Sequence, residues 1–131
     1  MLVTTGTTIA GFELTVRDLE RSANFYSAGL GLSIRVREDH GEFQEIHLVG
    51  ERDTAALLLV NPAIADAPLN TLPDSIKITL LTDDVRKLYA QALGAGAEEV
   101  QAPQHYAPLD IWFAQLRDPD GYTVLLTQRH E

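Results

Sequence analysis

Glu13 is the residue whose type and position most suggest chemistry. It stands between Phe12 and Leu14 in a segment where apolar and polar residues alternate. We therefore expect Glu13 to project from a strand on the face opposite those neighbours. A carboxylate on an otherwise apolar face can hold a ligand amine or act as a general base. An ion pair with Lys77, or a solvated position at a rim, would instead give Glu13 a structural role.

Two histidines could assist a carboxylate in proton transfer. His47 lies in a second alternating segment and shares a face with Phe43 and Glu45. His105 lies in a proline-flanked segment that predicts a loop. Imidazole gains or loses a proton near neutral pH, which suits it to acid–base chemistry. We therefore take Glu13, His47 and His105 as the candidate catalytic residues, with a surface or core role as the alternative for His47.

The composition excludes several kinds of chemistry and partner. With no cysteine, the chain has no disulfide framework, no thiolate nucleophile and no cysteine-based metal centre. It lacks a glycine-rich phosphate loop and a serine nucleophile elbow. Its formal net charge of −9 disfavours nucleic acid, whose phosphates would repel it. No apolar run approaches the ~20 residues of a membrane span and no secretory signal opens the sequence, so we expect a cytoplasmic protein with a small-molecule partner.

The elements that must position these residues occur twice. Each half of the chain starts with an alternating strand, followed by an aspartate that can cap a helix, an amphipathic stretch and a pair of glycines. The capping residues are Asp18 and either Asp83 or Asp84, and Asp18 and Asp84 are about half the chain apart. Three further strands are expected in each half, at 32–37, 43–49 and 55–60 and then at 98–101, 111–116 and 122–127.

A proline-rich stretch separates the two halves, from Asn61 to Pro73, and predicts a linker. A tight turn is predicted near the end of the chain at Asp118-Pro119-Asp120-Gly121, because proline presets φ and glycine permits a positive φ. We therefore expect one α+β domain over residues 1–131, built of two βαβββ modules at about 9–61 and 74–128.

Four fragments resemble motifs of the vicinal oxygen chelate superfamily, which includes glyoxalase I, the bleomycin resistance proteins and the extradiol dioxygenases. The fragments are Asp18-Leu19-Glu20-Arg21-Ser22, Phe25-Tyr26, Leu30-Gly31 and Asp118-Pro119-Asp120-Gly121-Tyr122. The resemblance covers roughly residues 9–128. It implies a curved mixed sheet with helices on its outer face and a cleft between two modules, which pair within one chain or across a homodimer.

Metal-dependent members of this superfamily carry histidine, glutamate or glutamine at four positions that face the cleft. The resemblance places these positions at Gly11, Lys77, Leu125 and Leu59, with Leu57 as the alternative to Leu59. Glycine and leucine offer no donor atom, and a protonated lysine repels a divalent ion. We therefore expect neither a metal nor another cofactor at this site. A displaced metal site built from Glu13, Glu45, His47 and His105 is the alternative.

Without those ligands the sequence resembles the metal-free, acidic and dimeric bleomycin resistance proteins, which sequester a molecule in an aromatic-lined cleft. We predict a homodimeric, metal-free protein that binds a small, largely apolar or cationic molecule, as in antibiotic sequestration. One of the adjacent Trp112 and Phe113 must face the cleft, because successive residues of a strand point to opposite sides. The residues expected to contact the ligand are Glu13, Thr15, Phe43, His47, Leu59, Lys77, Thr79, Tyr106, Trp112 and Leu125.

Two enzyme functions stand beside the binding function. The first is a metal-independent isomerase, cyclase or lyase with Glu13 as general base and His47 or His105 assisting. The second is a metal-dependent lyase or dioxygenase that uses the displaced site. The sequence leaves the choice between binding and catalysis open.

Overall fold

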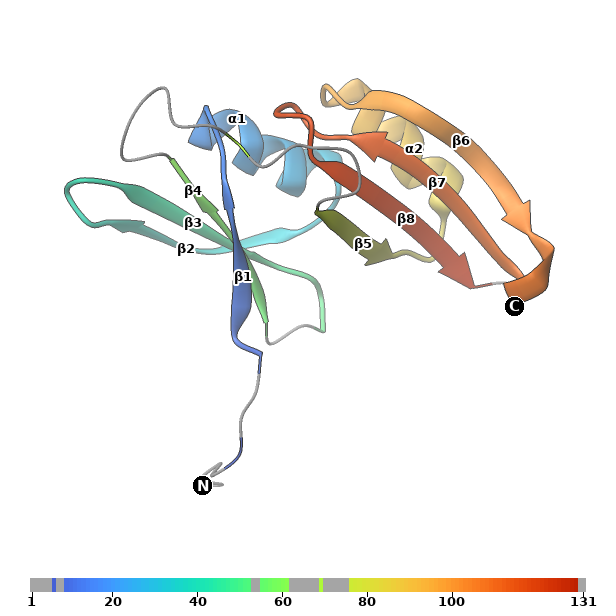
Figure 1. Cartoon of the computed structure of the whole chain (residues 1–131), viewed down its shortest axis with the longest axis horizontal. Coiled ribbons are helices and arrows are strands. Elements are labelled where there is room, and N and C mark those ends of the chain that lie inside the picture. Colours follow the sequence, from blue (N-terminus) through green and yellow to red (C-terminus); the bar gives the residue numbers. More distant parts are fainter. Residues whose placement is uncertain (1–5, 7–8, 53–54, 62–68, 70–75, 130–131) are drawn as a thin grey trace.

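The computed structural model describes residues 6, 9–52, 55–61, 69 and 76–129. In chain order, its elements are β1 (Gly11–Thr15), α1 (Leu19–Asn24), the π-helical segment η1 (Phe25–Gly29), β2 (Ser33–Asp39), β3 (Gln44–Val49), β4 (Ala56–Val60), β5 (Lys77–Leu81), α2 (Val85–Gly94), β6 (Glu98–Tyr106), the 3₁₀ turn η2 (Ala107–Leu109), β7 (Ile111–Arg117) and β8 (Thr123–Arg129). The strands form two four-stranded sheets, in the orders β1-β4-β3-β2 and β5-β8-β7-β6 (Figure 1). Both sheets are mixed, because β1 pairs with β4 and β5 with β8 in parallel while the other pairs are antiparallel. This architecture confirms the predicted α+β fold of two βαβββ modules, which we call the N-terminal module (β1–β4) and the C-terminal module (β5–β8).

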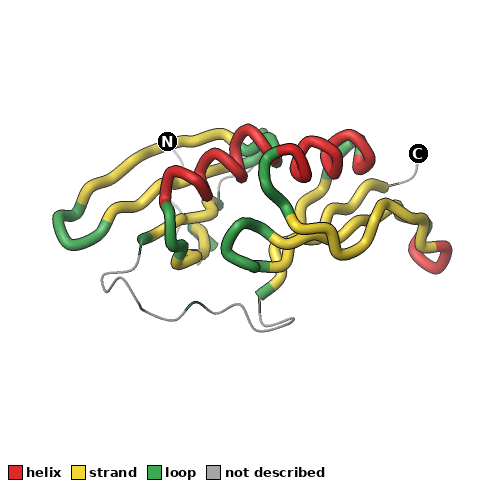
Figure 2. The backbone as a smooth tube through the Cα atoms, turned by 90° about the horizontal axis from the view of Figure 1, so that it is seen from above, coloured by secondary structure: helices red, strands yellow, loops and turns green. Residues whose placement is uncertain are grey.

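Both α-helices begin at the predicted capping aspartates. The side chain of Asp18 accepts a hydrogen bond from the backbone N–H of Arg21 at 3.0 Å. In the same way, Asp84 accepts one from Lys87 at 3.1 Å. α2 packs against η1, and Figure 2 shows the two helices following one another along the same side of the molecule. The helices therefore leave the other face of each sheet uncovered.

The core lies between the helices and one face of each sheet. In the N-terminal module, Leu14 on β1 pairs with Leu59 on β4, which pairs with Ile46 on β3. All three side chains are buried on the helix-facing side. In the C-terminal module, Leu126 on β8 and Ala114 on β7 form the corresponding pair and are equally buried. The same strand positions thus build both halves of the core.

The prediction that Leu59, or alternatively Leu57, faces the cleft from β4 is wrong. Leu57 and Leu59 both lie in the core, with 6% and 0% of their surface exposed, so neither faces away from the helices. Leu58, which pairs with Glu13, is the residue that lies on the opposite face. β4 reads Ala-Leu-Leu-Leu-Val, a continuous apolar run without alternation. Only its register with β1 reveals which side chains point where, and a one-residue slip reverses every assignment.

β6 is longer than the sequence predicts. The strand expected at 98–101 continues to Tyr106, so residues 103–106 are part of a strand and not a loop. Pro103 is tolerated because β6 is an edge strand, where one side of the backbone has no partner that needs an N–H. Of the predicted linker, only Asn61 and Leu69 fall within the described residues. None of the helices in the described ranges is long and apolar enough to cross a membrane.

The turn at residues 118–122 joins the two modules. Asp118 is 3% exposed and accepts a hydrogen bond from the Tyr26 hydroxyl at 2.7 Å. It also accepts the backbone N–H groups of Asp120 and Tyr122, each at 2.9 Å. Burial raises the pKa of the Asp118 carboxyl, and burial likewise raises the pKa of Tyr26 well above its ordinary value. The Tyr122 hydroxyl donates a hydrogen bond to the carbonyl of Thr15 at 2.7 Å, so this turn also links the C-terminal module to β1.

Candidate functional site

The face of each sheet away from the helices, which we call the open face, carries most of the predicted site residues. In the N-terminal module two rows of cross-strand neighbours run over this face. The rows are Glu13–Leu58–His47–Val36 and Thr15–Val60–Glu45–Glu38. Glu13, Thr15 and His47 therefore lie on the side that strand alternation predicts, and their role as ligand contacts stays a prediction.

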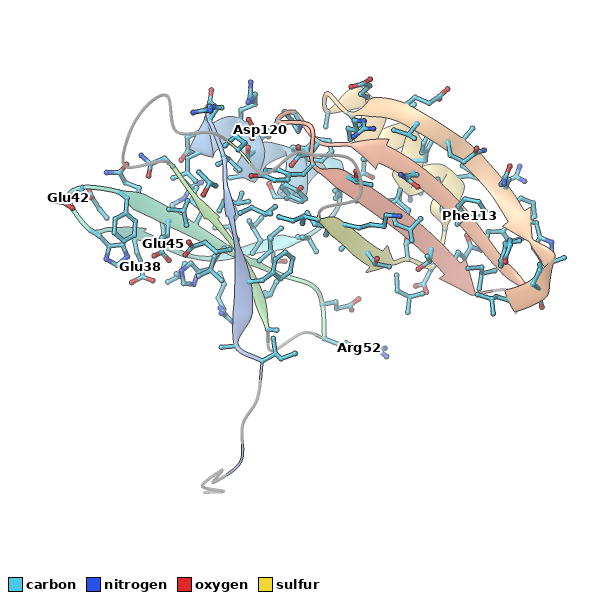
Figure 3. All side chains as sticks on the ribbon, viewed as in Figure 1. Glu38, Glu42, Glu45, Arg52, Phe113 and Asp120 are labelled. Carbon is cyan, nitrogen blue, oxygen red and sulfur yellow. The ribbon has the colours of Figure 1, made fainter. Side chains whose placement is uncertain are left out.

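Four acidic and imidazole side chains meet on this face at the β2–β3 hairpin, and we call them the Glu/His cluster: Glu38, His40, Glu45 and His47. The Nε2 atom of His47 lies 2.8 Å from Oε2 of Glu45 and 3.2 Å from Oε1 of Glu38. The Nε2 atom of His40 lies 3.4 Å from Oε1 of Glu45 and 3.9 Å from Oε2 of Glu38. Figure 3 shows Glu38 and Glu45 directed to the same side of the hairpin, with Glu42 at its tip. The two carboxylates thus alternate with the two imidazoles.

The hairpin backbone fixes this arrangement. Glu38 and Glu45 are direct partners in the antiparallel β2–β3 pair. His40 lies in the turn, where its N–H donates to the carbonyl of Phe43 at 2.9 Å. Its ring stacks on Phe43, with ring centroids 4.7 Å apart and planes 26° apart. Phe43 therefore supports His40, and any contact of Phe43 with a ligand stays a prediction.

The open face of the C-terminal module is less charged. Two of its rows are Thr79–Leu125–Gln115–Gln101 and Leu81–Thr127–Phe113–Gln104. Tyr106 lies beside Phe113 in an edge-to-face contact, with ring centroids 6.4 Å apart. Lys77 occupies a third row on the same face, next to Thr123. Four predicted ligand contacts, Lys77, Thr79, Tyr106 and Leu125, thus lie on one open face.

Trp112 and His105 lie on the opposite side from the one predicted. Trp112 packs against the core, and the guanidinium of Arg86 on α2 lies 4.7 Å from the centre of its ring. His105 pairs with Trp112 across β6 and β7, and its Nε2 lies 2.8 Å from Oδ1 of Asp110. Of the adjacent aromatics, Phe113 is the one on the open face. His105 therefore joins neither Glu13 nor the Glu/His cluster, and the displaced metal set that included it is not assembled.

A hollow of about 570 Å³ opens between the β1–α1 corner and the β2–β3 hairpin. Its lining includes the ion pair of Arg37 with Glu20, whose Nη1 and Oε2 atoms are 2.6 Å apart. Asn61 and Gln44 close one wall through two hydrogen bonds of 2.7 and 2.8 Å. The hollow is lined by charged side chains of both signs together with the apolar Leu19 and Ile46. It borders the Glu/His cluster through Glu38 and Glu45 but does not enclose it.

The sequence matches the model of the Glyoxalase/Bleomycin resistance protein/Dioxygenase superfamily over residues 8–126. That range includes both sheets and both open faces. The chain belongs to this superfamily. The match confirms the resemblance carried by the helix-opening and turn motifs, since the vicinal oxygen chelate proteins are this group.

Solved structures of the superfamily share the fold at low sequence identity. TnmS3, an antibiotic binding protein from Streptomyces sp. CB03234, superposes with a TM-score of 0.75 at 22% identity, over 98% of this chain and 100% of its own. A domain from Frankia sp. EAN1pec gives a TM-score of 0.75 at 17% identity, over 96% of this chain and 100% of its own. Glyoxalase I from Zea mays gives 0.73 at 22% identity, over 94% of this chain but only 45% of its own. The chain thus spans about half the length of the maize enzyme, and no curated protein matches its sequence.

The four positions that the resemblance assigns to the superfamily's metal ligands carry no side chain that fits an ion in this chain. With the register of β4 corrected, they hold Gly11, Leu58, Lys77 and Leu125. None of these offers a carboxylate or imidazole donor. At Gly11 the backbone also leaves no room, because an added Cβ would collide with the carbonyl oxygen of Ala56. A ligating side chain could not be placed there without moving β4.

Glu38 and His40 are the members of the cluster that sequence reasoning missed. The Asp39-His40-Gly41 turn marks the hairpin in the sequence but does not give its register, because a loop of these three residues would pair Glu38 with Glu42. Asp39 accepts the backbone N–H of Gly41 at 2.8 Å, a bond that lowers the pKa of the Asp39 carboxyl. The loop of the hairpin is the four residues 40–43, and counting outwards from it pairs Asp39 with Gln44 and Glu38 with Glu45.

Proposed function

We propose that this protein is a cytoplasmic homodimer that binds a small, largely apolar or cationic molecule on its open faces, as in antibiotic sequestration, without a metal ion at the superfamily's four positions. The observation that carries the proposal is the exposure of apolar side chains on these faces. Leu81 is 64% exposed, Tyr106 45% and Val36 40%. Large apolar groups that gather on an exposed surface mark binding sites.

Single charged groups among these apolar side chains support selection of the ligand by charge. Glu13 is exposed and has Leu58 as its cross-strand neighbour. Lys77, at the start of β5, is an exposed charge on the open face of the other module. Aromatic side chains on the C-terminal face, Phe113 and Tyr106, offer ring surfaces for stacking. A cationic aromatic molecule would use both the carboxylate and the rings.

The homodimer follows from the shape of a single chain. Its helices cover one face of each sheet, and each open face forms only one wall of a binding site. A second copy would supply the opposite wall and cover the exposed Leu81. TnmS3, which this chain matches over its full length, is described as an antibiotic binding protein, and this supports ligand binding as the function.

The test is a ligand screen on tag-free protein by thermal unfolding, followed by calorimetry. The probes are planar aromatic amines and neutral analogues of the same size. We expect members of both sets to raise the unfolding temperature. Glu13→Gln should weaken the amines about tenfold, equivalent to about 1.4 kcal/mol, and leave the neutral analogues unchanged.

Glu42→Gln is the matched control, because Glu42 is an exposed carboxylate at the tip of the β2–β3 hairpin (Figure 3). It should change neither set of affinities. If no probe stabilises the wild-type protein, the binding function is wrong. Equal losses for amines and neutral analogues in Glu13→Gln would contradict the role given to Glu13.

The metal-independent enzyme with Glu13 as general base gains no support from the geometry. His47 lies in the same row as Glu13, but its Nε2 is engaged by Glu45 and Glu38. His105 lies on the other side of the C-terminal sheet, beside Trp112. Neither predicted partner is directed at the Glu13 carboxylate.

A further inference from the structure

The Glu/His cluster has the donor atoms and spacing of a metal site. One ligand atom from each of Glu38, His40 and Glu45 lies within 4.8 Å of the others. The Nε2 of His47 adds a fourth donor, 2.8 and 3.2 Å from the two carboxylates. Two donors that each lie about 2.1 Å from a tetrahedral ion are roughly 3.4 Å apart. The Nε2 of His47 lies 2.8 and 3.2 Å from one oxygen of each carboxylate, and the Nε2 of His40 lies 3.4 and 3.9 Å from the other oxygen of each, so both imidazoles lie near that spacing from the carboxylates.

The carboxylate oxygens of the cluster outnumber the protons that its two Nε2 atoms can donate. Glu38 and Glu45 are direct cross-strand partners, and like charges in that relation destabilise a sheet. Each imidazole Nε2 carries at most one proton, so the two histidines can donate to only two of the four carboxylate oxygens that face them. A divalent cation among the four side chains would contact both carboxylates and both nitrogens at once.

The cluster is also held in place before any ion binds. Glu45 and His47 project from the middle strand β3, with side chains only 13% and 16% exposed. Stacking on Phe43 orients the ring of His40. Glu38, on the edge strand β2, is 43% exposed and leaves the site open to solvent. Ligands that are already ordered lose less entropy when the ion binds.

We propose that Glu38, His40, Glu45 and His47 bind a divalent first-row transition ion, at the β2–β3 hairpin and away from the superfamily's four metal positions. The two imidazoles select this class, because imidazole suits zinc, nickel, iron and copper, whereas magnesium and calcium prefer all-oxygen sites. This site does not depend on the proposed small-molecule function. The ion is the only ligand needed to test it.

The experiment titrates tag-free, chelator-treated and desalted protein with Zn²⁺, Co²⁺ and Mg²⁺. Calorimetry should give one Zn²⁺ per chain, and Co²⁺ should develop visible absorption bands whose intensity reports its coordination. Mg²⁺ should give no heat of specific binding. The double variant His40→Gln/His47→Gln should lose about 100-fold or more in Zn²⁺ affinity, since even outer-shell partners are worth about 10–100-fold.

Two controls match the variants in chemistry but lie outside the cluster. His105→Gln removes an imidazole that is 2.8 Å from a carboxylate elsewhere in the chain, and Glu42→Gln removes a carboxylate from the same hairpin. Both should bind Zn²⁺ as the wild type does. Glu38→Gln, at an exposed edge-strand position, serves if the double variant fails to fold, and it should weaken Zn²⁺ at least about tenfold.

The proposal is overturned if Zn²⁺ and Co²⁺ do not bind stoichiometrically at micromolar concentrations. It is also overturned if they bind but the cluster variants retain the wild-type affinity, because the ion would then sit elsewhere. A cluster that binds no ion would be a set of polar contacts between the histidines and the glutamates. The screen with aromatic amines gives its result independently, so failure of one proposal is distinguishable from failure of the other.

Discussion

The two modules have the same fold and core but carry different chemistry on their open faces. Leu58 and Leu125 correspond, because they are the partners of Glu13 and Thr79 on the matching strands. By the same register, His47 corresponds to Gln115 and Glu45 to Phe113. The N-terminal module thus has donors for an ion where the C-terminal module has an amide and an aromatic ring.

This difference between the modules shows which side chains of the repeated fold are constrained by packing. Side chains on the helix-facing side must fill the space beneath α1 or α2, and they stay apolar in both modules. Side chains on the open face meet no helix and can change without loss of the core. Function is therefore expected on the open faces, and the two modules offer different contributions to it.

The largest asymmetry between the modules is the turn that joins them. Asp118 is buried and accepts three hydrogen bonds, one of them from Tyr26 of the other module. Asp118→Ala should lower the free energy of unfolding by about 3 kcal/mol, because it leaves a buried hydroxyl and two backbone N–H groups without their acceptor. Glu51, in the corresponding region between β3 and β4, is exposed, and Glu51→Ala should change stability by less than about 0.5 kcal/mol.

Urea unfolding followed by circular dichroism measures both variants. Asp118→Asn provides a further comparison, because an amide keeps an oxygen for the backbone donors and carries no buried charge. It should unfold at urea concentrations between those of Asp118→Ala and the wild type. If Asp118→Ala and Glu51→Ala lowered the free energy of unfolding equally, the turn at 118–122 would reverse the chain without stabilising the contact between the modules.

The sequence was informative where a local pattern has one structural solution. The capping aspartates Asp18 and Asp84 predicted both helix starts, and the alternation in β1 predicted the side on which Glu13 lies. β4 and the Trp112-Phe113 pair lack such a pattern. Their faces depend on register with neighbouring strands, which is a long-range property.

The site residues show the same limit. Glu38 and Glu45 are neighbours only because of the hairpin register. The sequence around either residue alone predicts a solvated charge. His105 was placed with the site because prolines suggested a loop, whereas an edge strand accommodates Pro103. Asp118 links the two modules through its hydrogen bond with Tyr26. Because Tyr26 is far away in the sequence, no local pattern predicts that contact.

A second test compares Gly11 with Lys77, which begin β1 and β5 and occupy matching positions. A Cβ at Gly11 would collide with the backbone of Ala56, so Gly11→Ala should destabilise the protein by about 2 kcal/mol through local overpacking. Lys77 is exposed, so Lys77→Ala should stay within about 0.5 kcal/mol of the wild type. Thermal unfolding measures both. Near-equal stability of the two variants would show that β4 can move, and the superfamily's metal position could then accept a side chain.

The smallest expected difference in stability is between substitutions in two arginine–carboxylate ion pairs whose N–O distances are similar. Arg21 lies 2.9 Å from Asp120, whose side chain is 1% exposed, whereas Arg37 lies 2.6 Å from Glu20, whose side chain is 70% exposed. Arg21→Ala should cost about 1 kcal/mol, because a buried carboxylate loses a charged donor and keeps neutral ones such as the Ser22 hydroxyl and the Arg17 backbone N–H.

Arg37→Ala should cost less than about 0.5 kcal/mol, since exposed ion pairs are solvated and screened. Urea unfolding at low and high salt separates the two cases. The small effect of Arg37→Ala should vanish in high salt, while part of the effect of Arg21→Ala should persist because the carboxylate of Asp120 is buried, although Arg21 itself is 47% exposed. If salt removed both effects equally, the contact between Arg21 and Asp120 would be a surface interaction that contributes little to holding the two modules together.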